Sequence, residues 1–220
     1  MFRLKEPRTM KKAYMILGTV STLLFVLLII LLKTVDVSVV GATSTEIGLS
    51  AFNNALALPV NENIDKLSDL FLCVAIFEAV SLMAVGVVQL FKGKSFKKVD
   101  KGVIFAGVAF VVLMLAYVFF EVFIINYRGF LVEGEIEASF PSSHTMIFFV
   151  ITGIFTDYCA HKFKFKKLIS FVGALLIVLS TVLRVFSGMH WITDIIGAVL
   201  LSIAIIAFYK GILIKTEGKK

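Results

Sequence analysis

The sequence has few charged residues, few prolines and almost no cysteine. Charged side chains make up 17% of the 220 residues and there are 3 prolines, whereas 59% of the residues are hydrophobic and the mean hydropathy is +0.98. A soluble domain of this length does not carry so much apolar sequence, so the chain is expected to be an integral membrane protein. The two cysteines, Cys73 and Cys159, lie inside separate apolar runs, which excludes a disulfide or cysteine–metal framework and favours a packing role.

Six apolar runs approach or exceed the length of about 20 residues with which a helix crosses a bilayer core. They cover residues 14–32, 70–90, 103–125, 143–160, 168–183 and 191–209. The first run follows a basic segment, as the core of a cleaved signal peptide does, but it is longer than a typical signal core, which favours an uncleaved helix. The predicted fold class is all-α, an integral membrane bundle of six helices.

The longest polar segment, residues 33–69, contains five acidic residues and only two lysines. Within it Leu49, Phe52 and Leu56 recur at helical spacing. A short helix on the membrane surface near a functional site and an ordinary loop helix packed on its neighbours explain this pattern equally well.

The distribution of positive charge predicts the orientation of the bundle. Of the 22 lysines and arginines, 18 lie in four segments, which are residues 1–12, 92–101, 161–167 and 210–220. Six spans place all four segments on one side, which the positive-inside rule makes the cytoplasmic side of the plasma membrane. The net charge of +7 is thus explained by topology and does not indicate nucleic-acid binding. The remaining four basic residues, which fall on the predicted outer side, are Lys33, Lys66, Arg128 and Arg184.

Residues 184–194 carry an arginine, a histidine and an aspartate in almost wholly apolar surroundings. Ionisable groups at the edge of a bilayer core are costly, and by default they mark a functional site. His190 and Asp194 are four residues apart and share one face of a helix, so the aspartate can accept the proton of one imidazole nitrogen. The other nitrogen is then an oriented nucleophile. Arg184 offers a planar fork of donors that suits phosphate.

A second polar cluster, Pro141-Ser142-Ser143-His144, opens the fourth apolar run. Proline and serine are typical of a helix start, where the first backbone N–H groups form an anion site. Two histidines, two arginines (Arg128 and Arg184) and this helix start suit phosphoryl transfer through a covalent histidine.

Each of these features has a simpler explanation when it is taken alone. A membrane histidine commonly forms a hydrogen bond between helices, an arginine at a helix end commonly anchors at the interface, and Pro-Ser-Ser is sufficient as a helix cap. Their occurrence together, in this order and on the same predicted side of the membrane, favours a catalytic site.

The arrangement resembles the type 2 phosphatidic acid phosphatase superfamily, which also includes vanadium haloperoxidases. Members share three motifs: Lys-x6-Arg-Pro, Pro-Ser-Gly-His and Ser-Arg-x5-His-x3-Asp. Residues 141–144 resemble the second motif and residues 183–194 the third, and the similarity covers about residues 102–209. The first motif is degraded, because Arg128 fits but Gly129 stands in the place of the proline and Glu121 in that of the lysine.

The resemblance implies a metal-independent lipid phosphatase that needs no cofactor. It implies that His190 attacks phosphorus, that Asp194 orients His190, and that His144 protonates the leaving group. The residues expected to bind the phosphate are Arg128, Ser142, Ser143 and Arg184. Glu133, Glu135 and Glu137 are spaced by two and could bind a cation, but a solvated loop explains them better.

The missing lysine leaves alternatives open. A carboxylate at Glu121 would repel phosphate unless it were protonated or paired with Arg128. The chain is therefore expected to be a lipid phosphatase or else a weakly active or non-catalytic membrane protein that binds lipid phosphates, with Lys66 as the first candidate for a replacement cation. The implied substrates are phosphatidic acid, phosphatidylglycerol phosphate or a polyprenyl diphosphate such as the undecaprenyl carrier.

We expect two regions along the chain. Residues 1–101 form an N-terminal membrane region with two helices and an outer loop, and residues 102–214 form a phosphatase-like core with four membrane helices. The sequence does not determine the oligomeric state.

Overall fold

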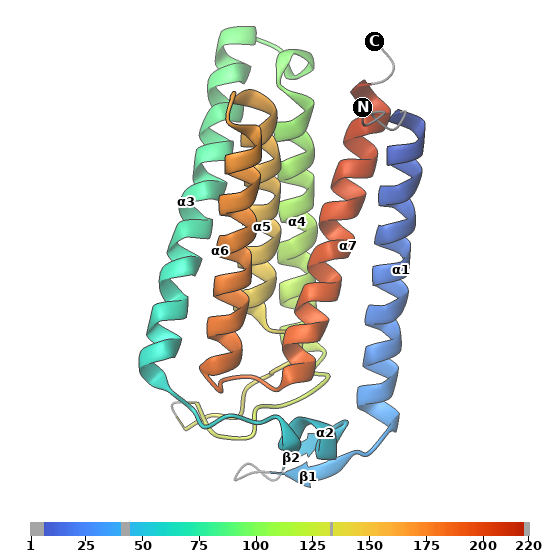
Figure 1. Ribbon diagram of the computed structural model, residues 1–220, viewed down its shortest axis with the longest axis vertical. Coiled ribbons are helices and arrows are strands. Elements are labelled where there is room, and N and C mark those ends of the chain that lie inside the picture. The colour runs from blue at the N-terminus through green and yellow to red at the C-terminus, as the bar shows by residue number, and fades with distance from the viewer. Residues whose placement is uncertain (1–6, 41–44, 133, 218–220) are drawn as a thin grey trace.

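Six long helices run side by side along the bundle (Figure 1). They are α1 (Pro7–Thr34), α3 (Glu62–Gly93), α4 (Lys101–Val122), α5 (Ser143–Lys162), α6 (Lys166–Phe186) and α7 (Ile192–Glu217). The computed structural model describes residues 7–40, 45–132 and 134–217. Glu133 and the outermost residues of the two terminal basic segments, 1–6 and 218–220, lie outside this part of the chain. The predicted all-α fold class is confirmed.

The remaining elements are short. A hairpin of β1 (Ser38–Val40) and β2 (Thr45–Ile47) pairs Val39 with Glu46, and α2 (Ser50–Ala55) follows it. A 3-10 turn, η1 (Phe96–Lys98), lies between α3 and α4.

The short helix α2 packs against the start of α7. The Asn53 amide oxygen is buried and accepts hydrogen bonds from the Thr193 N–H at 3.3 Å and from the Thr193 hydroxyl at 3.1 Å. This contact packs α2 on the bundle, but Phe52 and Leu56 of the helical pattern are 48% and 49% exposed, so both explanations of the spacing in residues 33–69 stay predictions.

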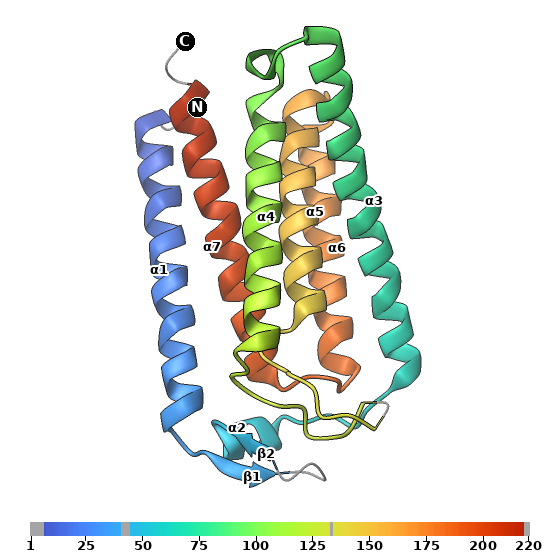
Figure 2. The same cartoon turned by 180° about the vertical axis from the view of Figure 1, so that it is seen from behind.

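Helix α5 lies inside the bundle, in contact with α3, α4, α6 and α7, and α1 packs along α7 (Figures 1 and 2). Leu113, Met146 and Ile154 are among the fully buried side chains of this core. The outward faces of the other helices are apolar as well: Phe77 is 71% exposed and Leu115 is 66% exposed. Exposed apolar faces of this extent suit contact with lipid.

Five helices of the described part of the chain, α1, α3, α4, α6 and α7, are each long and apolar enough to cross a membrane. The sixth, α5, has 20 residues and a length of about 30 Å, which also matches a bilayer core. Its polar residues are tolerated there because its neighbours shield it from lipid. The chain is a multi-pass membrane protein.

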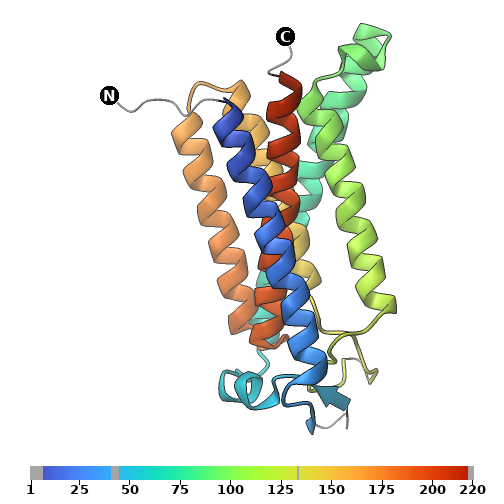
Figure 3. The ribbon, with the colours of Figure 1, turned by 90° about the vertical axis from the view of Figure 1, so that its right-hand side faces the viewer.

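The connections gather at two opposite ends of the bundle (Figures 1 and 3). The first turn of α1, the α3–α4 connection, the α5–α6 connection and the last turn of α7 lie at one end. The described residues of the four basic segments therefore share an end, as the even number of spans predicts. The hairpin, α2 and the segments 123–142 and 187–191 lie at the other end. The predicted division between residues 101 and 102 stays a prediction.

Helix α3 begins at Glu62, well before the predicted apolar run. The Asn61 side chain caps it by accepting hydrogen bonds from the N–H groups of Asn63 and Ile64. The additional turns extend beyond the apolar run and put Asp65 and Asp69 on a helix.

Phe140 anchors the segment that leads into α5. Its ring is 1% exposed and stacks on Phe25 with centroids 5.6 Å apart. It also lies against Gly197 of α7, where an added Cβ would come within 2.3 Å of the ring. This close approach requires glycine and fixes Ser139 and Pro141, which flank Phe140.

Candidate active site

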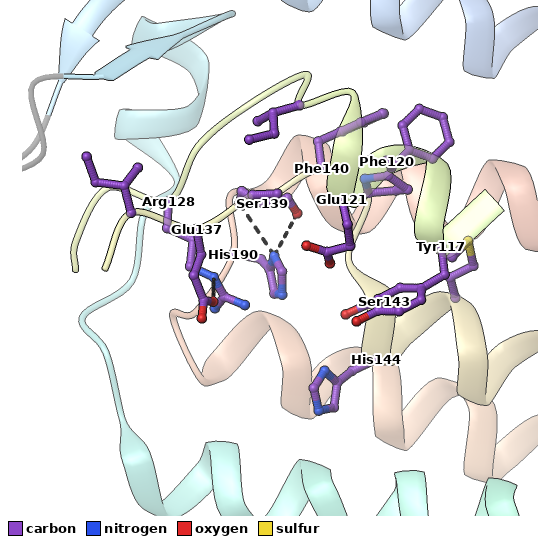
Figure 4. Close-up of a pocket in the computed structure, with 15 residues that line it drawn as sticks. Tyr117, Phe120, Glu121, Arg128, Glu137, Ser139, Phe140, Ser143, His144 and His190 are labelled. Carbon is purple, nitrogen blue, oxygen red and sulfur yellow. Dashed lines mark hydrogen bonds and ion pairs between the residues drawn. The ribbon is translucent and has the colours of Figure 1, made fainter. Parts of the chain in front are cut away.

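A cavity of about 400 Å³ opens among the end of α4, the segment before α5, the first turn of α5 and His190 (Figure 4). Its polar lining includes both candidate histidines, His144 and His190, together with Arg128. Apolar side chains complete the wall, namely Phe120, Ile124, Ile136 and Met146. The structure therefore brings together residues that the sequence separates by more than sixty positions.

His190 is held in one tautomer by two neighbours of opposite hydrogen-bonding character. Its Nδ1 lies 3.0 Å from the carbonyl oxygen of Ser139, and its Nε2 lies 3.2 Å from an amino group of Arg184. A carbonyl can only accept and a guanidinium can only donate, so the proton is on Nδ1 and the lone pair is on Nε2. An imidazole in this state is a nucleophile at Nε2.

The surroundings of His190 also keep it neutral. The side chain is 2% exposed, and burial, together with the positive charges of Arg128 and Arg184, holds the pKa of His190 well below its usual value. The unprotonated nucleophile is therefore the favoured form at neutral pH.

Asp194 lies beside His190 but is not the direct acceptor of its proton. Its Oδ2 is 3.6 Å from Nδ1, and it accepts instead from the Ser139 hydroxyl, in a short hydrogen bond, and from the Trp191 N–H at 2.9 Å. The predicted pairing of Asp194 with His190 is thus largely indirect, through Ser139. The fully buried carboxylate is still close enough to stabilise a positive charge on the imidazole.

Arg184 is 2% exposed and is bound on several sides. One amino group contacts His190, while the other forms a short ion pair with Asp65 and donates to the Ser68 hydroxyl at 3.2 Å. Both partners on α3 were missed by the sequence analysis. The four-residue spacing of Asp65 and Asp69 in the first turns of a helix is the signal that would have found this acidic face.

Arg128 ties the segment before α5 to the segment before α7. It donates to the Met189 carbonyl at 3.0 Å, and its Nε lies 3.2 Å from the Glu137 carboxylate. Next to Met189, Gly188 has φ 66° and faces the backbone of Pro59, a conformation and an approach that favour glycine. The turn that presents His190 is thereby fixed.

Ser143 and His144 line the cavity, whereas Ser142 does not. Ser142 is fully buried, its N–H donates to the Asp194 carbonyl at 3.1 Å, and its hydroxyl accepts from Thr145 at 3.2 Å. Its hydroxyl makes no cap hydrogen bond to the start of α5. The N–H groups of Ser143 and His144, in the first turn of that helix, are therefore better placed for an anion than that of Ser142.

Acidic side chains also reach the cavity. Glu121 and Glu137 both line it, with Glu137 paired to Arg128. Lys66, the expected replacement cation, is largely exposed and lies 4.0 Å from Glu62. Lys33 instead donates at 3.2 Å to the carbonyl of Ile124, a residue that lines the cavity.

Within the described residues, no group of three or more His, Cys, Asp or Glu side chains is arranged to hold a metal ion. Of the acids in the 133–137 segment, Glu135 is exposed and Glu137 pairs with Arg128, while Glu133 lies outside the described residues.

The chain is also similar to known proteins. A family model described as the PAP2 superfamily matches residues 80–215. Phosphatidylglycerophosphatase B of Bacillus subtilis (strain 168) is 30% identical over 81 residues, which are 35% of this chain and 40% of that protein. The match thus spans less than half of the relative's length.

A solved structure has the same fold. It is described as the crystal structure of the first transmembrane PAP2 type phosphatidylglycerolphosphate phosphatase from Bacillus subtilis. The similarity has a TM-score of 0.59 at 19% identity and covers 92% of this chain and 96% of that one.

Proposed function

This chain belongs to the PAP2 superfamily, and from that membership and the geometry of the site we propose that it is a membrane lipid phosphatase working through a phosphohistidine. One observation carries the proposal: His190 presents the Nε2 lone pair beside Arg184 while Ser139 holds the Nδ1 proton. A protein that only binds phosphate has no need of a nucleophile oriented in this way.

In the first step, the substrate phosphate takes the place beside Arg184 and the N–H groups of Ser143 and His144. These donors offset the charge that develops on the phosphate oxygens. Nε2 of His190 attacks phosphorus, the N–P bond forms, and the bond from phosphorus to the lipid oxygen breaks. His144 gives a proton to the departing oxygen, which leaves as an alcohol or, from a diphosphate, as a phosphate.

In the second step, water breaks the phosphohistidine. Neutral His144 removes a proton from the water as it attacks phosphorus, the N–P bond breaks, and inorganic phosphate leaves. His190 returns to its neutral state with the proton on Nδ1. Asp194 and the Ser139 carbonyl stabilise the positive charge on the imidazole while the phosphoryl group is attached.

The substrate is proposed to be a lipid phosphomonoester or diphosphate. The cavity combines phosphate-binding groups with an apolar wall at the end of the bundle, so a headgroup can enter while its chains stay in the lipid. Phosphatidylglycerol phosphate is the first candidate because similar proteins carry that activity in their names. Phosphatidic acid and the undecaprenyl diphosphate carrier are the alternatives.

The test is phosphate release by the purified protein from each of these lipids, with a chelator present and no added magnesium. We expect release from at least one of them. Absence of release from all of them, in protein that retains its helical content, would reject the proposed activity.

The orientation in the membrane is a further part of the proposal. We propose that the cavity opens at the outer face, which the shared end of the described basic residues and the positive-inside rule support. In intact cells we expect Glu135→Cys to react with a membrane-impermeant thiol reagent and Lys97→Cys to stay unlabelled until the cells are opened. The parent, with Cys73 and Cys159, gives the background, and the reverse pattern of labelling would invert the orientation.

Glu121→Lys tests the role of the missing lysine. Replacing a negative charge by a positive one beside a doubly charged phosphate is expected to raise kcat/KM by about tenfold, mainly through KM. Glu121→Gln is the control and should lie between the parent and the lysine variant. A parent that binds lipid phosphate but turns over only after this substitution would instead be a lipid-phosphate-binding protein.

A further inference from the structure

The proton-donating histidine of the site has a carboxylate partner on a different helix. His144 Nε2 lies 3.0 Å from Oδ1 of Asp69. Asp69 is in the second turn of α3, 75 positions before His144 and outside residues 80–215, which match the family model.

The other nitrogen of this imidazole is free for chemistry. Nδ1 of His144 is buried and has no hydrogen-bond partner among the described residues, although the side chain lines the cavity. A buried polar atom without a partner is costly in a site that has no use for it. A substrate oxygen or a water molecule is the partner that the proposal below assigns to it.

Asp69 is held in place by the helix that carries it. Asp65 lies one turn earlier on the same face and forms the ion pair with Arg184. The Ser68 hydroxyl donates to the Asp65 carbonyl at 2.8 Å and accepts from Arg184. The end of α3 therefore faces both the phosphate-binding and the proton-transferring groups.

We propose that Asp69 is a positioning residue that holds the Nε2 proton of His144, so that Nδ1 is the nitrogen that exchanges protons with the substrate. The assignment rests on the proposed phosphatase function. In this assignment Nδ1 is both the proton donor of the first step and the proton acceptor of the second. Protonated Nδ1 donates to the departing oxygen, and the same atom then accepts the proton of the attacking water. Asp69 keeps the Nε2 proton throughout, so the net protonation of the pair changes only at Nδ1.

The competing explanation is that the contact between His144 and Asp69 is only a structural ion pair between α3 and α5. Substrates with different leaving groups distinguish this explanation from the positioning role. An alkyl phosphate needs a proton on its departing oxygen, whereas p-nitrophenyl phosphate does not. In single-turnover formation of phosphohistidine we expect Asp69→Asn to slow the reaction of a short-chain phosphatidic acid by about 10- to 100-fold. The reaction of p-nitrophenyl phosphate should slow by less than about threefold, because its departing oxygen requires no general acid.

The matched control is Glu62→Gln, a carboxylate-to-amide change in the first turn of α3 whose carboxylate lies 4.0 Å from the exposed Lys66. It should leave both rates unchanged. Equal losses with both substrates in Asp69→Asn, or no loss with either, would overturn the positioning role.

A measurement without turnover keeps this inference separate from the proposed activity. The chain has 3 histidines, so a spectrum of protein labelled with ¹⁵N-histidine can be assigned from a His144→Asn variant. At alkaline pH we expect the neutral His144 ring to carry its proton on Nε2 and to change its signals in Asp69→Ala. A proton on Nδ1, or signals unchanged in the variant, would reject the assignment even if the protein is an active phosphatase. If the parent hydrolyses no lipid phosphate, the proposed function fails and the spectrum still decides the tautomer.

Discussion

Replacing His190 with alanine is expected to lower lipid phosphate hydrolysis by about four orders of magnitude or more, because the reaction loses the atom that attacks phosphorus. The measurement is phosphate release by purified protein, together with trapping of the phosphohistidine in an acid-free quench. The variant should form none of it. Its helical content should match that of the parent, since removal of one side chain beside the cavity leaves the helices intact.

His161→Ala is the matched control for this variant. His161 lies at the basic end of the bundle, where Nδ1 is 2.7 Å from the Asp157 carbonyl, far from the cavity along α5. It should keep the parent's rate. Substantial turnover by His190→Ala, or trapped phosphohistidine in it, would require a different nucleophile.

Arg184→Lys is expected to reduce kcat/KM by about 10³-fold, the second largest effect among these variants. Lysine keeps the positive charge opposite Asp65, so the half-buried carboxylate retains a partner and the fold should persist. A single ammonium group cannot reproduce the fork with which Arg184 reaches His190 and Asp65 at once, and it cannot bind a phosphate in the bidentate way that a guanidinium allows.

The rate should be measured across substrate concentrations, so that binding and turnover are separated. Arg8→Lys, the same substitution at an exposed position in the first turn of α1, should leave both parameters unchanged. A rate within a fewfold of the parent's in Arg184→Lys would show that charge alone is sufficient at this position, and it would shift the transition-state contact to Arg128 or to the start of α5.

Properties that depend on residues close together in the sequence were predicted from the sequence alone. The length and composition of the apolar runs gave six helices, because a helix that meets lipid must be apolar along its own length. The proline, serine and histidine at residues 141–144 marked the start of α5. The alternation of basic segments predicted that they share an end, since each span reverses the direction of the chain.

Contacts between helices could not be predicted from the sequence, because they join residues that are far apart in the chain. Arg184 and Asp65 are 119 positions apart and His144 and Asp69 are 75 apart. Whether their side chains meet is decided by the rotation of α3 about its axis and by how far it extends beyond the membrane-spanning run. Asn61 sets that extension by capping the helix before the apolar residues begin.

The hydrogen bonds of His190 also depend on the tertiary structure. His190 lies before α7 begins at Ile192, so it does not share a helical face with Asp194 as the spacing predicted, although the two side chains do lie 3.6 Å apart. The Nδ1 proton nevertheless meets the backbone carbonyl of Ser139, because Phe140 is buried against Phe25 and Gly197 and holds its neighbour over the imidazole. The sequence by itself determined which residue types come to this end of the bundle. The packing of one aromatic ring, which no local pattern encodes, determined which atom accepts the proton of the nucleophile.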